Sequence, residues 1–378
     1  MTAVTHSPVL PTYARLGVTF VEGDGVRLTA DTGETYLDFA AGIAVVGLGH
    51  LHPDVTTAAH EQLDKLWHVS NLYWTQPMAQ LADRLSERFG GAEAFFCNSG
   101  AEAVEAALKY ARKATGRIAV LALEGSFHGR TLGALGVTGQ PGKREAFEPL
   151  LGPVRFARPN DVESLRTGIG PDTGLVLLEP VLGEGGVVPL TPGFLRAAAE
   201  VAAQTGAFLC LDEVQTGVGR TGTFFAFEQA GVRPDLVTLA KGLANGLPLG
   251  CLLVAEDAAG GFDPGDHAST FGGNPVACAA ACAVCDAVDE ELLERVRAVG
   301  AELRAGLDRI GAVQDVRGLG LLVGAELDRP AGPVVAACLE RGLLVTSAGE
   351  RVLRLTPPLV VDRGDVGEAL DILREVLA

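Results

Sequence analysis

The sequence predicts an α/β fold in which helices cover both faces of a mostly parallel central sheet. Two observations support this prediction: short apolar runs lack polar alternation, and helical patterns separate those runs. The 378 residues leave room for two or three domains of about 150 residues each. We expect residues 54–275 to form a large α/β domain. Residues 1–53 and 276–378 would form a smaller α+β domain from both chain ends.

The individual elements follow in chain order. Residues 18–30 hold two short strand patterns about a Gly-Asp-Gly turn. Buried strands are expected at 118–123, 174–178, 207–211, 236–240 and 251–255. Helices are expected at 54–66, 78–88, 102–114 and 193–203. The remainder should contain one long helix from Pro275, strands within 313–327, and helices near 334–341 and 366–377.

Charge and hydropathy exclude several classes of function. The formal net charge of −17 disfavours partners such as nucleic acid and anionic membrane surfaces. The longest charge-free apolar stretch, residues 275–285, is far shorter than the roughly 20 residues that a membrane-spanning helix needs. The first eight residues show neither a basic start nor an apolar segment, so we expect no export signal and a cytoplasmic location.

The seven cysteines are expected to be free thiols. Their number is odd and no close Cys-x-x-Cys pair lies in a turn, which argues against a disulfide framework. Cys278, Cys282 and Cys285 recur at helical spacing on an alanine-rich segment, but no histidine adjoins them. Since cysteine is among the most buried residue types, core packing is the better interpretation and no metal is assigned.

Two ionisable residues end neighbouring strand patterns. Asp212 follows residues 207–211, and Lys241 follows residues 236–240. A salt bridge at the strand ends would explain either residue. However, a lysine in such a place must be paired, neutral or used covalently. A Schiff base with an aldehyde cofactor, and a carboxylate beside the cofactor's pyridine nitrogen, would explain both, which points to pyridoxal phosphate.

The start of the helix near residue 100 offers a phosphate site. Ser99 and Glu102 have the spacing of a capping box, and Gly100 would let an anion approach the free backbone N–H groups. Alone this pattern would indicate an ordinary helix cap. Two glycine motifs are weaker candidates: residues 217–222 lack a following helix pattern and predict a turn, and residues 318–324 predict tight backbone packing.

Five longer motifs occur in one order along the chain. They are Phe-Cys-Asn-Ser-Gly-Ala-Glu-Ala at 96–103, Phe-His-Gly-Arg-Thr at 127–131, Leu-Asp-Glu-Val-Gln-Thr-Gly-Val-Gly-Arg-Thr-Gly at 211–222, Leu-Ala-Lys-Gly-Leu at 239–243 and Ser-Thr-Phe-Gly-Gly-Asn-Pro at 269–275. Together they resemble class III, ornithine-type aminotransferases from about Leu37 to the C-terminus. The resemblance implies fold type I, a homodimer with shared active sites, and pyridoxal 5'-phosphate as cofactor.

The resemblance also implies roles toward the cofactor. Lys241 would form the Schiff base and then move a proton, while Asp212 would hold the pyridine nitrogen in its protonated form. Phe127 and Val214 would sandwich the ring, a flat apolar slot that suits a π-system. The other contacts, to the phenolic oxygen and the phosphate, would come from Gln215, Ser99, Gly100, Ala101 and Thr270 of the partner subunit.

Motifs at 36–39, 42–45, 48–50 and 68–73 are similar to those of the class members that act on N-acetylornithine in arginine biosynthesis. The reaction implied moves the δ-amino group of acetylornithine to 2-oxoglutarate. Arg130 and Arg354 would bind the α-carboxylates of acetylornithine and glutamate, respectively. Glu184 would pair with Arg354 when glutamate is absent. Further substrate contacts would come from Ser70, Asn71 and Ser269.

Some positions depart from the family pattern, and some alternatives stay open. Ala101 and Val46 stand where the family often has threonine and asparagine. Arg220 and Glu179 are interpreted as structural, with Glu179 at the edge of the pocket. An enzyme acting on ornithine, succinylornithine, 4-aminobutyrate or a carrier-linked lysine precursor would keep the same catalytic residues. A non-catalytic subunit that retains the fold is the alternative from another class.

Overall fold

The central element is a seven-stranded sheet in the order β4-β12-β11-β10-β7-β5-β6. Its strands are β4 (Ala92–Cys97), β5 (Ala119–Leu123), β6 (Val154–Ala157), β7 (Thr173–Leu178), β10 (Phe208–Asp212), β11 (Leu236–Leu239) and β12 (Gly250–Ala255). Strand β12 alone runs in the direction opposite to the other six strands of this sheet. The mostly parallel sheet expected from the sequence is confirmed, with the five expected strands ending within one residue of their expected bounds.

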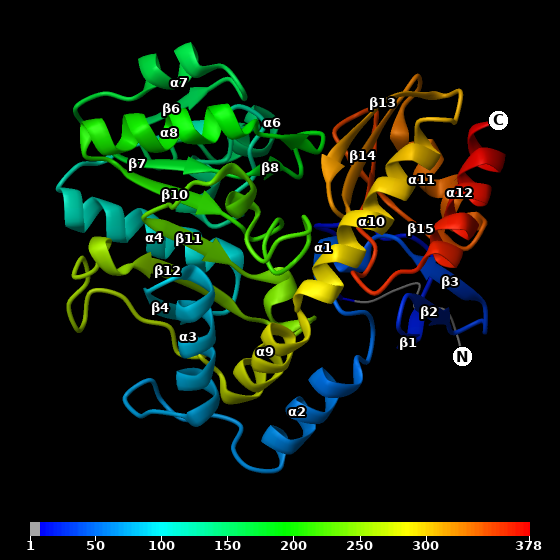
Figure 1. Ribbon diagram of the computed structural model, residues 1–378, viewed down its shortest axis with the longest axis horizontal. Helices are drawn as coiled ribbons and strands as arrows, with labels where there is room; N and C mark the ends of the chain where they lie inside the picture. The colour runs from blue at the N-terminus through cyan, green and yellow to red at the C-terminus, as the bar shows by residue number, and fades with distance from the viewer. Residues whose placement is uncertain (1–7) are drawn as a thin grey trace.

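The structure, a computed structural model, describes residues 8–378. Residues 1–7, which contribute to the expectation that no export signal is present, lie outside this range. Figure 1 shows two layered bodies, one around the central sheet and one that carries the C-terminus. Within the described range, no helix is both long and apolar enough to cross a membrane.

Helices cover the central sheet. The helices that contact its strands are α3 (Gln76–Phe89), α4 (Gly100–Thr115), α7 (Val162–Gly168) and α8 (Pro192–Thr205). Helix α9 (Pro275–Ala287) packs on α3, and α2 (Pro53–Leu63) packs on α9. Strands β5, β7 and β12 are buried along their whole length, although alternate side chains point to opposite faces. Both faces of the sheet are therefore covered, which explains why these strands lack polar alternation.

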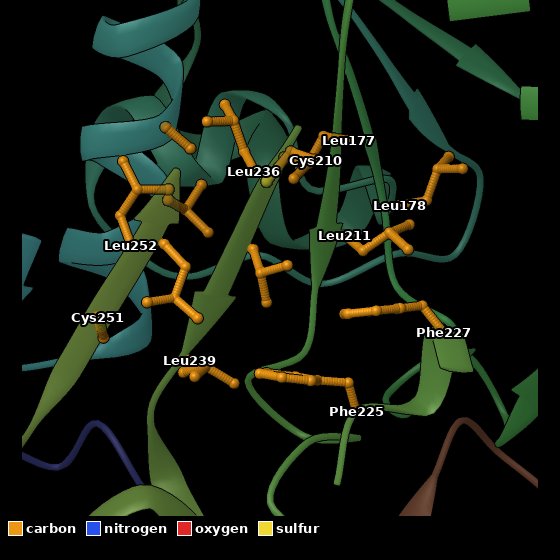
Figure 2. Packing of buried hydrophobic residues seen from close by; sticks show 14 of the residues in the cluster. Leu177, Leu178, Cys210, Leu211, Phe225, Phe227, Leu236, Leu239, Cys251 and Leu252 are labelled. Atoms are coloured by element: carbon orange, nitrogen blue, oxygen red, sulfur yellow. The ribbon is translucent and has the colours of Figure 1, made fainter. Parts of the chain in front are cut away.

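Large apolar side chains from neighbouring strands fill the first core. Figure 2 shows Leu177, Cys210, Leu236 and Leu252 on adjacent strands of the sheet. Phe225 and Phe227, in the segment after β10, pack against this layer. Their rings stack with centroids 5.0 Å apart. The core thus supports the strands up to the point where β10 and β11 end.

A second core joins the two ends of the chain. Leu37 and Phe39 pack in one cluster with apolar residues between Val296 and Leu377. One sheet has the order β1-β2-β3-β15 and another the order β13-β14-β17-β16. Their strands are β1 (Phe20–Asp24), β2 (Arg27–Ala30), β3 (Thr35–Asp38), β13 (Val313–Leu319), β14 (Leu322–Leu327), β15 (Leu343–Leu344), β16 (Thr346–Ala348) and β17 (Val352–Leu355). The covering helices are α10 (Glu290–Leu307), α11 (Ala331–Glu340) and α12 (Arg363–Leu377).

The single long helix expected from Pro275 is wrong, because the chain breaks between α9 and α10. Asp289 begins α10 by accepting a hydrogen bond from the backbone N–H of Leu292 at 2.9 Å. The buried residues of α9 pack in the first core, and Figure 1 shows α9 beside α2. We therefore propose that the large domain extends through α9 to about residue 289, rather than ending at residue 275.

The two glycine motifs form backbone contacts with each other. Residues 217–222 form turns and start no helix, as expected. A Cβ atom on Gly320 would lie only 2.5 Å from the carbonyl carbon of Thr221, so the second motif is held against the first. Buried Arg220 donates to the carbonyl oxygens of Leu321 and Pro357, which gives it a structural role between the two cores.

Candidate active site

A cavity of about 410 Å³ lies where β10 and β11 end. This is the edge at which an open α/β sheet usually binds ligands. Nine residues expected at the site line it: Ser99, Gly100, Ala101, Phe127, Arg130, Asp212, Val214, Gln215 and Lys241. Residues more than 140 positions apart in the sequence therefore line one cavity. From the sequence, only their positions at strand ends suggested that they lie close together.

Asp212 is the last residue of β10 and is buried. Its Oδ1 accepts hydrogen bonds from Thr238 Oγ1 at 2.9 Å and from the Val214 backbone N–H at 3.1 Å. Its Oδ2 lies 2.7 Å from Nδ1 of His128. Three donors therefore hold the carboxylate in place. His128 and Thr238 were not among the predicted site residues, although His128 belongs to one of the quoted motifs.

Lys241 begins a short turn directly after β11, with a backbone φ of 45°. A left-handed conformation is costly for a residue with a long side chain and often occurs at functional sites. Within residues 8–378 its amine makes no hydrogen bond and no ion pair, so the salt bridge to Asp212 is absent there. Burial, and then the positive charge of Arg354, lower the pKa of Lys241.

The N-terminus of α4 offers donors to an anion. The Ser99 side chain accepts from the Glu102 backbone N–H at 3.2 Å, and Glu102 Oε2 accepts from the Asn98 backbone N–H at 2.6 Å. The cap differs from the expected box, since Glu102 reaches the backbone of Asn98 rather than that of Ser99. Gly100 and Ala101 line the cavity, and their N–H groups donate to no other group in the described chain.

Phe127 and Val214 both border the cavity. A Cβ atom on Gly100 would lie 2.8 Å from either methyl group of Val214, so glycine is needed for this close approach. Glu179 Oε1 accepts from the backbone N–H of Phe127 at 2.8 Å and so fixes its position. Burial raises the pKa of Glu179 to about 7.

Arg354, on β17, carries the buried cation of the site. It donates to Glu184 Oε1 at 2.5 Å, to the Gly183 carbonyl at 3.2 Å and to Gln215 Oε1 at 3.4 Å. The expected contact between Arg354 and Glu184 is therefore present. Burial disfavours the charge of Glu184, but Arg354 and then Lys143 outweigh it and lower the pKa of Glu184.

Four predicted residues lie elsewhere on the single chain. Ser70, Asn71, Ser269 and Thr270 line a separate depression together with Leu72 and Trp74. Asn71 Nδ2 donates to the Ser269 carbonyl at 2.8 Å. Ser269 Oγ accepts from Asn98 Nδ2 at 3.1 Å, and Asn98 also borders the first cavity. Thr270 does not line that cavity within residues 8–378.

A left-handed turn approaches the cavity from the N-terminal part of the chain. All four residues of α1 (Ala41–Ala44) have positive φ, between 47° and 67°. Buried Asp38 accepts from the backbone N–H groups of Ala40 and Ala41, at 3.0 and 2.7 Å. The turn brings Val45 to the cavity. No sequence signal indicated it, because three of the four residues are not glycine.

Comparison with known proteins places the geometry in context. The family model described as aminotransferase class-III matches residues 11–377. The acetylornithine aminotransferase of Streptomyces coelicolor is 49% identical over 92% of this chain and 88% of its own. The crystal structure of N-acetylornithine aminotransferase from Stenotrophomonas maltophilia is similar with a TM-score of 0.85 and 38% identity, covering 96% of both chains. The ornithine aminotransferase of Toxoplasma gondii reaches a TM-score of 0.93 at 31% identity, over 98% of this chain and 92% of that one.

Proposed function

The chain belongs to the class-III aminotransferases, and from this membership we propose that it transfers the δ-amino group of N2-acetyl-L-ornithine to 2-oxoglutarate. The products are N-acetyl-L-glutamate 5-semialdehyde and L-glutamate, a step of arginine biosynthesis. The acetylornithine aminotransferases that share its sequence along almost the whole chain support this choice of amine. One observation carries the proposal: buried Arg354 pairs with partly buried Glu184 and also donates to Gln215, which lines the same cavity as Lys241.

Class-III aminotransferases use pyridoxal 5'-phosphate, which when bound supplies an aldehyde for the amino group and a ring that withdraws electrons. The residues of this chain fit that cofactor. The N–H groups of Gly100 and Ala101, which have no acceptor within residues 8–378, suit a phosphate, and Asp212 suits a protonated ring nitrogen. We assign the phosphate to Ser99, Gly100, Ala101 and the partner subunit's Thr270, and the ring to Phe127, Val214, Gln215 and Asp212.

Lys241 has the properties of a general base. Its lowered pKa gives a larger neutral fraction near pH 7 than a solvated lysine has, and only the neutral amine accepts a proton. We assign to it the removal of the proton from the substrate carbon that bears the amino group, and the delivery of that proton to the carbon that would carry the aldehyde of the bound cofactor. Asp212 is held by three hydrogen-bond donors at one side of the cavity during this transfer.

Arg130 and Arg354 are suited to the carboxylates of different substrates. Arg130 is exposed at the cavity and makes no ion pair within the described part of the chain, so it is available to the single carboxylate of acetylornithine. Arg354 is occupied by Glu184 until a dicarboxylate arrives. One cavity can then accept an ω-amine with one carboxylate and an α-amino acid with two.

We also propose a homodimer in the cytoplasm. The segment from Leu66 to Trp74 exposes several large apolar side chains, and Phe271 lies against His68 with ring centroids 5.5 Å apart. A patch of this kind usually marks a protein interface. All seven cysteines are free thiols, which suits a reducing compartment.

The test of the reaction is a panel of amines with 2-oxoglutarate, with glutamate formation as the readout. Acetylornithine should give a higher kcat/KM than ornithine, succinylornithine or 4-aminobutyrate. If ornithine or another amine is used equally well, the choice of acetylornithine fails while the class of reaction stands. Lys241→Ala should abolish turnover and still retain some cofactor through the phosphate contacts. Unchanged turnover would overturn the assignment of Lys241.

A further inference from the structure

Glu184 contacts two cations rather than one. Its Oε1 accepts from Arg354 Nη1 at 2.5 Å, and its Oε2 lies 3.8 Å from Nζ of Lys143. Lys143 comes from α6 (Pro141–Arg144), which precedes β6, whereas Arg354 lies on β17, a strand that packs in the second core through Leu353 and Leu355. The carboxylate therefore bridges two parts of the fold that are distant in sequence.

The two cations differ in their exposure. The Arg354 side chain is 2% exposed and the Lys143 side chain 26%, so Lys143 lies nearer the solvent. Lys143 Nζ lies 4.8 Å from the ring centroid of Phe127, a residue of the cavity wall. Glu184 is the only acidic partner that Lys143 has within residues 8–378.

A dicarboxylate that binds Arg354 must displace Glu184 from it. Glu184 is partly buried, and a buried carboxylate without a partner is strongly destabilising. Lys143 avoids this loss of stability, because Glu184 can keep a cationic partner through its other carboxylate oxygen. A substrate with one carboxylate, bound by Arg130, leaves the pair of Arg354 and Glu184 intact and makes no such demand.

We propose that Lys143 is a positioning residue that retains Glu184 when a dicarboxylate occupies Arg354. It thereby favours the half of the reaction that uses 2-oxoglutarate and glutamate, and leaves the half that uses the ω-amine unchanged. The inference rests on the proposed function for its substrates. For any dicarboxylate that binds Arg354, Lys143 should strengthen binding only while Glu184 is present.

The direct test uses glutarate, a dicarboxylate with no amino or keto group. Its binding to the holoenzyme is measured by titration calorimetry for wild type, Lys143→Gln, Glu184→Gln and the double variant. Lys143→Gln should weaken glutarate binding about tenfold in the wild-type background, as expected when a close charge pair is lost. In the Glu184→Gln background the same change should alter the affinity less than twofold, because the two residues act together.

Two further variants make the result specific. Lys143→Arg keeps the charge and should restore most of the glutarate affinity. Lys65→Gln removes a lysine that also lies near a carboxylate, 3.7 Å from Glu61, but on the surface, and should change nothing. In steady-state assays, Lys143→Gln should raise the KM for 2-oxoglutarate and leave that for acetylornithine unchanged.

An equal loss of affinity in both backgrounds would mean that Lys143 contacts the dicarboxylate directly, and it would overturn the proposal. So would unaltered glutarate binding in Lys143→Gln. Melting curves of each variant exclude loss of the fold as the cause. The outcome is independent of the amine panel: if acetylornithine is a poor substrate but glutarate binding follows the expected pattern, the proposed function fails and the role of Lys143 stands.

Discussion

Single residues at this site depend on neighbours that come from distant parts of the sequence. Asp212 could be identified from its place at the end of an apolar run, but its partner His128 is 84 positions away. Nε2 of His128 is buried and has no partner within the described residues, so this ring serves Asp212 through Nδ1 alone. The motif that contains His128 was visible in the sequence, whereas the contact was not.

Replacing His128 with leucine should weaken binding of the cofactor by about tenfold or more. The change removes one of three donors to Asp212, and a hydrogen bond to a charged group contributes about 1.5–3 kcal/mol. The measurement is a titration of the cofactor-free protein, followed by absorbance. His128→Asn, which can still present a donor near Nδ1, should lose less. Equal affinities for all three proteins would show that this contact does not support the site.

Glu213 should make stability depend on pH. Burial raises its pKa to about 7 from the ordinary 4.5, and it accepts from Thr216 Oγ1 at 2.5 Å and the Phe227 N–H at 3.0 Å. The folded chain keeps this proton between pH 4.5 and 7 while the unfolded chain releases it. The contribution of this group to the free energy of unfolding is therefore fully present below pH 4.5. It decreases by at most roughly 3 kcal/mol as the pH rises to 7.

Glu213→Gln removes this titration and can keep both contacts. The urea midpoint of the wild type should fall relative to that of the variant between pH 5 and pH 8, measured on the holoenzyme. Parallel curves for the two proteins would contradict the raised pKa as a source of pH dependence.

At the scale of elements, the N-terminus of α4 is the part of the site that depends most on close packing. Gly100→Ala would place a methyl group 2.8 Å from Val214, so either the side chain or the helix start must move. We expect a cost of about 1–3 kcal/mol, the range for an added methyl group in a packed region. It should appear as a lower melting temperature and a weaker affinity for the cofactor.

The matched control is Gly193→Ala, also in the first turn of a helix. A Cβ atom there would meet nothing within 4 Å. This variant should keep both the cofactor affinity and the melting temperature of the wild type, or raise the latter slightly. A similar loss in both variants would mean that glycine flexibility, rather than the contact with Val214, is what the position needs.

The elements differ in how well sequence predicted them. Strands such as β5 and β7 are buried on both faces and read as continuous apolar runs. The turn of α1 could not be predicted, because three of its four residues with positive φ are not glycine. Similarly, β6 has only four residues and includes Arg155, so local pattern does not distinguish it from a loop.

At the scale of the whole molecule, the exposed patch near Trp74 should form the subunit interface. The Trp74 side chain is 85% exposed in the single chain. Trp74→Glu should shift the protein from dimer to monomer in light scattering after size exclusion, and lower turnover, since Thr270 would no longer reach the partner's site. Ile118→Glu alters an exposed apolar residue directly before β5 and should leave the dimer intact. A dimeric Trp74→Glu variant would place the interface elsewhere.

The sequence by itself determined the α/β class, the strand ends that carry Asp212 and Lys241, and the start of α4, because burial, capping and glycine usage are local properties of the chain. It also carried the family resemblance through motifs in a fixed order. Tertiary structure alone decided the contacts of His128 with Asp212 and of Lys143 with Glu184. These contacts join separate elements, and their distances follow from how both cores pack, which no local pattern encodes.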